Sequence, residues 1–222
     1  MNDSRRYHGL HGLDLKMRRH LDFDRGFFVE VGANDGVSQS NTLHYERWRG
    51  WRGVLVEPSH ANYFKCRASR SPETRVFCAA CVPFGYGERF VPMLYANLMS
   101  VSELEGTDLP DPRGHVESGR KYLAPQEDVV AYGAIPRTLN EILLEAAAPA
   151  VVDFFSLDVE GAELAVLQGI DHARFRFRHL LVECRGLPRM DAFLASHGYR
   201  HLEQLSPHDH LFVDARGSPT TA

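Results

Sequence analysis

The sequence has few cysteines and no long apolar run, and each shortage excludes a class of protein. Its 222 residues include four cysteines and a single Cys-x-x-Cys, at Cys78 and Cys81. A zinc ribbon needs a second pair, and this one lies in an apolar run, so we interpret the cysteines as ordinary core residues of a protein in the reducing cytoplasm. No apolar run approaches the roughly 18 residues of a membrane span, and the first 20 residues lack the apolar core of a secretory signal.

An excess of positive charge is also missing. The chain has 25 Lys and Arg against 29 Asp and Glu, which gives a net charge of -4. Nucleic acid binding needs a concentrated cationic face, so we predict neither a nucleic acid nor a membrane partner. The 44% of hydrophobic and 24% of charged residues are ordinary for a globular protein. We expect one domain over residues 1–215 and a frayed tail over 216–222.

Short apolar runs that alternate with helical patterns predict the fold. Strands are expected at 27–31, 53–57, 75–79, 151–157 and 179–183. Helices are expected at 43–49, 61–69, 138–146, 162–168 and 188–197, the third of them opened by a capping box of Thr138 and Glu141. Alternation of this kind is typical of an α/β protein with a Rossmann-like, doubly wound and mostly parallel sheet.

Three segments depart from this alternation. Residues 199–205 and 211–215, with a Ser-Pro-His-Asp turn between them, predict an antiparallel hairpin at the end of the chain. Residues 82–95 contain two glycines and are expected to form a small extra hairpin. Residues 96–133 are too long for a passive connection, so we expect an inserted loop or lid there.

The loop after the first strand indicates a nucleoside ligand. It reads Gly32-Ala-Asn-Asp-Gly36, at the carboxyl edge where such sheets bind ligands, and Glu57 ends the second strand 21 residues later. An acid in that place accepts the two hydroxyls of an adenosine ribose. The loop is not Gly-x-Gly-x-x-Gly, and Asp35 puts negative charge where a pyrophosphate would lie. S-adenosylmethionine, with its sulfonium and ammonium groups, fits better than a dinucleotide.

Further acids end the fourth and fifth strands. Asp158 and Glu160 follow the apolar run at 151–157, and Glu183 ends the run at 179–183. Because the carboxyl ends of parallel strands meet at one edge, we expect the three carboxylates to converge. They could form a general base, a sulfonium stabiliser or an oxygen-rich metal site. The structural alternative is that Glu160 merely caps the next helix.

Taken together, these motifs resemble an FkbM-family methyltransferase, a branch of the class I S-adenosylmethionine-dependent fold. The matching segments are GFFVEVGANDGVSQSNT, GWRGVLVEPSHANYFKCRASR, DFFSLDVEGAELAVLQGID, HLLVEC and GYRHLEQLSPHDHLFV. The resemblance implies a seven-stranded sheet with an antiparallel last strand. It also implies that the cofactor is bound by residues of the glycine loop, the segment after it and the acids that end two strands: Glu30, Gly32, Ala33, Asn34, Gly36, Ser40, Asn41, Glu57 and Asp158.

Many relatives methylate hydroxyls of sugars or polyketide-like natural products, so the expected acceptor is a small-molecule hydroxyl, most simply on a sugar. The Asn-Pro-Pro-Tyr-like motif of amino-group methyltransferases is absent after the fourth strand, which favours oxygen as the acceptor atom. Asp158 is the first candidate for the general base and Glu160 the second. No dedicated metal ligands are assigned, although a divalent cation held by these acids could also acidify the hydroxyl. The alternatives are a nicotinamide-dependent oxidoreductase and a non-catalytic binding module with the same fold.

Overall fold

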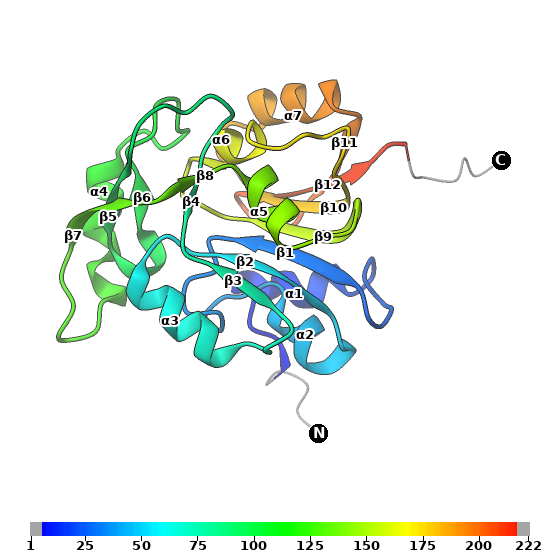
Figure 1. Cartoon of the computed structure of the whole chain (residues 1–222), viewed down its shortest axis with the longest axis horizontal. Coiled ribbons are helices and arrows are strands. Elements are labelled where there is room, and N and C mark those ends of the chain that lie inside the picture. Colours follow the sequence, from blue (N-terminus) through cyan, green and yellow to red (C-terminus); the bar gives the residue numbers. More distant parts are fainter. Residues whose placement is uncertain (1–5, 217–222) are drawn as a thin grey trace.

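A seven-stranded sheet forms the centre of the computed structural model, which describes residues 6–216 (Figure 1). Its strand order is β11-β12-β10-β9-β1-β2-β3. The strands are β1 (Phe27–Val31), β2 (Arg52–Val56), β3 (Arg75–Phe77), β9 (Val151–Leu157), β10 (Arg176–Glu183), β11 (Tyr199–Gln204) and β12 (Asp209–Asp214). All neighbouring strands from β3 to β10 pair in parallel, whereas β12 runs antiparallel to both β10 and β11. The predicted doubly wound, mostly parallel sheet with an antiparallel terminal hairpin is therefore confirmed.

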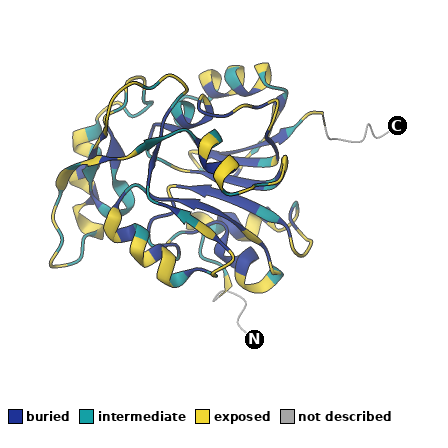
Figure 2. Cartoon of the chain, in the orientation of Figure 1, coloured by how far each residue is buried: buried dark blue, intermediate teal, exposed yellow. Residues whose placement is uncertain are grey.

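Helices cover both faces of this sheet, because successive side chains of a strand point to opposite faces. Val29 and Val31 pack in one core cluster with residues of α5 (Leu139–Glu145), α6 (Glu163–Leu167) and α7 (Leu187–Ser196). Phe28 packs in the other with residues of α1 (Leu13–Met17), α2 (Leu43–Arg49) and α3 (His60–Ser69). The strands are buried between these layers, and the outer helix faces are exposed (Figure 2). The predicted capping box is present at the start of α5.

The segment between β3 and α5 forms a second, smaller unit beside the carboxyl edge of the large sheet (Figure 1). A three-stranded sheet is made by β5 (Val91–Tyr95), β6 (Val101–Ser102) and β7 (Val130–Ala134), all antiparallel. The helices α4 (Pro112–Ser118), η3 (Asn97–Met99) and η4 (Gly119–Tyr122) lie within it. A short parallel pair, β4 (Ala80–Cys81) with β8 (Pro136–Arg137), joins it to the main body. The short helix η2 (Leu10–Gly12) precedes α1.

Two expectations about this region change. The predicted hairpin within 82–95 is wrong, since β5 pairs with β6 and β7, which lie outside that segment. Residues 96–133 are an inserted segment as predicted, but they carry helices and strands of their own rather than an open loop. The frayed tail expected at 216–222 lies, apart from Arg216, outside the described residues. Within residues 6–216, no helix is long and apolar enough to span a bilayer.

Candidate active site

The glycine loop after β1 is held close to the two neighbouring strands. The amides of Gly32 and Ala33 both donate to the carbonyl of Val56, at 3.1 Å. Gly32 has φ of 88°, and a Cβ there would lie 1.7 Å from the carbonyl oxygen of Asp158. Only glycine meets both requirements, so the loop backbone can pass directly over the ends of β1 and β9.

Glu30 holds residues 40–42, the segment after the glycine loop, in place by hydrogen bonds. Its carboxylate accepts hydrogen bonds from Ser40 Oγ at 2.9 Å, the Asn41 amide at 2.8 Å and Thr42 Oγ1 at 2.6 Å. The buried guanidinium of Arg70 lies 3.4 Å from the same carboxylate and 2.9 Å from Thr42 Oγ1. Glu30 is therefore largely occupied within the protein, and its first task is to shape the wall of the site.

Glu57 stands at the end of β2 and is buried. Its two carboxylate oxygens accept the amides of Asn34 at 2.9 Å and Ser59 at 2.8 Å. Burial raises the pKa of this carboxyl to about 7, although the two amide hydrogen bonds oppose the shift. Each oxygen keeps further acceptor capacity, so the carboxylate can still receive hydroxyl groups from a ligand.

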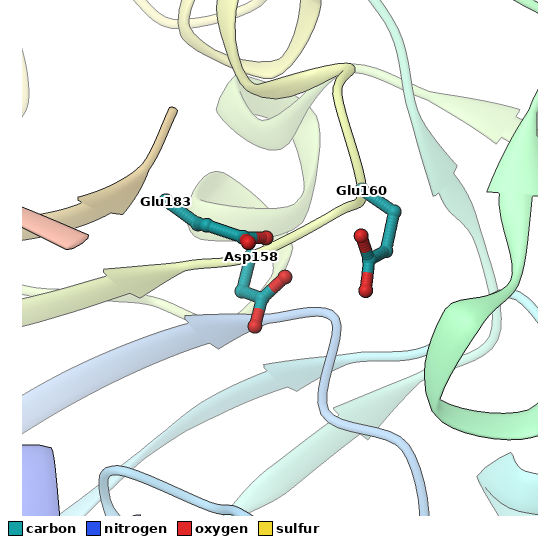
Figure 3. A group of neighbouring side chains, drawn as sticks. All are labelled: Asp158, Glu160 and Glu183. Atoms are coloured by element: carbon teal, nitrogen blue, oxygen red, sulfur yellow. The ribbon is translucent and has the colours of Figure 1, made fainter. Parts of the chain in front are cut away.

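Asp158, Glu160 and Glu183 converge at the ends of β9 and β10 (Figure 3), as the sequence predicted. One carboxylate oxygen from each lies within 4.8 Å of the others. The Asp158 side chain is exposed, but to a cleft walled by protein. Desolvation there raises its pKa well above the usual range, and the charges of Glu183 and Glu160 raise it further. The pKa of the neighbouring Glu183 is raised as well, first by burial and then by the charge of Glu160.

Arg185 compensates part of this negative charge. Its Nη2 lies 3.3 Å from oxygens of both Glu160 and Glu183. His115 Nε2 lies 2.9 Å from Glu160 Oε2, the oxygen that Arg185 also contacts. His115 belongs to α4, so the inserted segment contacts the acidic group directly.

A single cleft gathers most of the residues that the sequence singled out. It is lined by the predicted site residues Glu30, Gly32, Ala33, Asn34, Ser40, Asn41, Glu57, Asp158 and Glu160. Gly36 does not line it, because that residue packs against α3, where a Cβ would lie 2.9 Å from Cys66 Sγ and Ser69 Oγ. Asp35 is not part of the lining either. Its carboxylate accepts the amides of Val37 and Ser38, and so it does not put negative charge into the cleft as the sequence suggested.

A small apolar pocket adjoins the cleft on the side of β3 and β4. Its lining includes Pro58, Ala79, Ala80, Val159 and Ala162. The space beside the end of β3 is thus lined mostly by apolar side chains.

Several residues of the site were not found from the sequence. Asn97 of η3 lines the cleft itself. Arg70, just after α3, contacts Glu30, whereas His115 of α4 and Arg185 of the turn after β10 contact Glu160. Nothing in the local sequence of Arg70, Asn97 or His115 marks these residues, because each acts through a contact with a residue far away in the chain. Arg185, two residues after Glu183, carried the one usable signal, a cation next to a predicted acidic edge.

The strand order, the glycine loop and the acids after β2 and β9 define a class of protein, the Rossmann-like methyltransferases. The profile of the Methyltransferase FkbM domain matches residues 30–201, and the chain therefore belongs to the FkbM methyltransferase family. Comparison with curated protein sequences gave no match.

Solved structures give more distant likenesses. The methyltransferase FkbM from Methylobacillus flagellatus KT is 12% identical, with a TM-score of 0.49, over 95% of this chain and 56% of that one. The METTL16 methyltransferase domain is 12% identical, with a TM-score of 0.44, over 90% of this chain and 63% of that one. TrmK of M. capricolum, in complex with S-adenosyl-homocysteine, is 5% identical, with a TM-score of 0.43, over 89% of this chain and 66% of that one. This chain thus spans less than two thirds of each of the three.

Proposed function

We propose that this methyltransferase uses S-adenosylmethionine to methylate a hydroxyl group of a small molecule, most simply of a sugar or glycosylated natural product. One observation carries the proposal: the glycine loop, the buried carboxyl of Glu57 and the cleft-facing carboxyl of Asp158 meet in one cleft. That combination suits a ligand with a ribose at one end and positive charge at the other, and it does not suit a pyrophosphate.

The donor set of the cleft fits the cofactor. Glu57 would hold the ribose hydroxyls, and the apolar pocket beside Pro58 and Ala79 would receive the adenine. The close approach of Gly32 to Asp158 leaves room above the loop backbone for the amino acid end, with the wall shaped by Glu30 and Ser40. When bound, S-adenosylmethionine supplies an electrophilic methyl group on a sulfonium.

Asp158 is the residue we assign as general base. A carboxyl with a raised pKa is a stronger base than an ordinary aspartate, and nearby positive charge favours the ionised form in which it can accept a proton. Glu183 lies beside it, and its charge contributes to the raised pKa of Asp158. When Asp158 is ionised, the positive charge of Arg185 reduces the repulsion among the three neighbouring carboxylates. A divalent cation could serve the same purpose, but the proposed step does not require one.

Amide and hydroxyl groups at the mouth of the cleft favour a polyhydroxylated acceptor. Ser38, Gln39, Asn97 and Ser100 line this part, the last two from the inserted segment. Such groups recognise sugar hydroxyls by hydrogen bonding, and they offer no concentrated positive charge for a nucleic acid backbone.

Two measurements test the proposal. Calorimetry should show binding of S-adenosylmethionine and S-adenosylhomocysteine but not of NAD; the reverse result would establish the oxidoreductase alternative. A panel of monosaccharides, methyl glycosides and glycosylated natural products is then screened for release of S-adenosylhomocysteine. Cofactor binding with no turnover on any member, and none on amines, would favour a non-catalytic binding module.

A further inference from the structure

The contact between His115 and Glu160 joins two parts of the molecule that are distant in sequence. His115 lies on α4 of the inserted segment, and Glu160 follows β9 and lines the cleft. Both side chains are largely buried, with 13% and 15% of their surface exposed. The Nε2 atom of His115 is buried and makes no hydrogen bond of good geometry, and the polar atom that it contacts is Glu160 Oε2 at 2.9 Å.

The backbone of Glu160 is in an uncommon conformation. Its φ is 53°, in the left-handed region that a side chain other than glycine, asparagine or aspartate adopts at a cost. The amides on either side of it, those of Val159 and Gly161, donate to Glu163 Oε1 and fix the turn. The Glu160 carboxylate is contacted at Oε2 by both His115 and Arg185.

Neighbouring contacts show that the inserted segment is docked on the same loops. Asp108 Oδ2 accepts the amides of Arg185 at 2.7 Å and Gly186 at 3.0 Å, just before α7. The amide of Asp108 donates to the carbonyl of Gly161 at 2.9 Å. At the far side of the cleft, Asn34 Nδ2 donates to Asn97 Oδ1 at 3.0 Å. The segment thus bridges the glycine loop, the loop after β9 and the loop after β10.

We propose that His115 is a positioning residue for the acceptor side of this site. Its imidazole holds the Glu160 carboxylate at the edge of the cleft beside Asp158, where that carboxylate accepts a hydrogen bond from the acceptor. The inserted segment therefore completes the acceptor site, and it does so only when it is docked. This inference rests on the proposed function for the identity of the reaction, whereas the docking contact itself is independent of it.

The first test needs no acceptor. Amide hydrogen exchange of residues 106–122 is compared in the wild type, H115A and H115Q, with H208A as a control for loss of an exposed histidine on the terminal hairpin. Glutamine can place an N–H donor near the position of the histidine Nε2, so H115Q should keep the protection. H115A should lose it by about tenfold or more, in line with removal of a largely buried polar contact between the segment and Glu160. Equal protection in H115A and the wild type would overturn the docking role.

A second test separates this inference from the proposed function. Affinity for S-adenosylhomocysteine should stay within about twofold of wild type in H115A, because Glu57 and the glycine loop are untouched. With an acceptor found in the screen, H115A should raise KM about tenfold or more, and H115Q should restore most of it. Altered exchange with an unchanged acceptor KM would show that His115 is only structural. Failure of the wild type to bind S-adenosylhomocysteine would refute the cofactor and leave the exchange result standing.

Discussion

At the scale of single residues, the site depends on carboxyl groups whose surroundings differ. Glu30 is saturated by hydrogen bonds and an arginine, so it acts as a structural anchor. Glu57 and Asp158 are desolvated, and the pKa of each is raised. The same residue type thus supports the wall, receives a ribose and takes a proton, according to what lies around it.

Binding of the cofactor should weaken as the pH falls below 7. The pKa of Glu57 is about 7, and ribose hydroxyls donate to the ionised carboxylate, so ligand binding must expel a proton at lower pH. We expect the Kd for S-adenosylhomocysteine to rise by up to about tenfold per pH unit below 7 and to level off above it. Calorimetry at pH 5.5 to 8.5 measures this. E57Q should bind about tenfold or more weakly at pH 8 and should lose this pH dependence; a Kd equal to wild type would remove Glu57 from the site.

Replacing Asp158 by asparagine keeps its shape and removes its charge and basicity. If it is the general base, kcat should fall by roughly 100- to 10,000-fold while the cofactor Kd changes little. If it only holds the cofactor, the Kd rises and saturating cofactor restores the rate. Circular dichroism and thermal unfolding of D158N control for folding. Chelation should leave the wild-type rate unchanged, and a wild-type kcat in D158N would make this acid structural.

Which of these residues the sequence could reveal depends on how they act. Glu30, Gly32, Glu57 and Asp158 lie at strand ends, and strand ends can be recognised from apolar runs. His115 lies in a short polar helix with no periodic pattern to place it. Gly36 shows that a residue can also be assigned to the site wrongly. Gly32 and Gly36 look alike in the sequence of the loop, yet Gly32 lies against Asp158 after β9 and Gly36 packs on α3.

At the scale of elements, the central strands were predictable from their apolar runs, because a strand covered on both faces must be apolar at nearly every position. Val152, Phe154 and Phe155 in β9 are fully buried, and the strand predicted over 151–157 is confirmed. The strands of the inserted unit were not found. In β7 most residues are exposed or half-buried, and β6 has only two residues, so neither carries a clear pattern.

The inserted segment should become more ordered when ligand occupies the cleft. Asn97 and Ser100 line the cleft, and Asn97 also donates to the carbonyl of Tyr122, which ties η3 to η4. We therefore expect amide exchange over residues 97–122 to slow when S-adenosylhomocysteine binds, by roughly tenfold for the amides of η3. Residues of α5, which follow β8 in the chain and pack in the main core, serve as the internal control, because their exchange should not respond to the ligand. Exchange that is equally slow with and without ligand would mean a fixed wall and no lid.

At the scale of the whole molecule, the doubly wound topology brings the loops after β1, β2, β9 and β10 to one edge. This follows from the parallel direction of the strands and was predictable from their alternation with helices. The position of the inserted unit over that edge was not predictable. It depends on side-chain contacts such as those of Asp108 and His115, for which the sequence has no periodic signal.

This topology also concentrates buried acids in one part of the molecule, which should make the protein less stable as the pH rises above neutrality. Burial raises the pKa of Glu163 to about 8 and that of Glu57 to about 7, above the ordinary value of 4.5. A carboxyl with a raised folded-state pKa contributes stability at low pH that is lost as the pH rises through its folded pKa. His172, whose pKa burial lowers to about 4, acts in the opposite sense, but only below pH 6.5.

Between pH 6.5 and 8, the pH dependence of the free energy of unfolding therefore reports on the buried acids and not on His172. We expect the free energy of unfolding, measured by urea denaturation without ligand, to fall across this window, with Glu163 alone accounting for roughly 1 to 2 kcal/mol of the loss. E163Q keeps an oxygen that can accept the amides of Val159 and Gly161, which Glu163 Oε1 accepts at 2.9 and 3.1 Å. The variant should equal or exceed the wild type at pH 8 and should lose that part of the slope, because its side chain does not ionise. A slope unchanged in E163Q would show that Glu163 is not the group that binds the extra proton in the folded state.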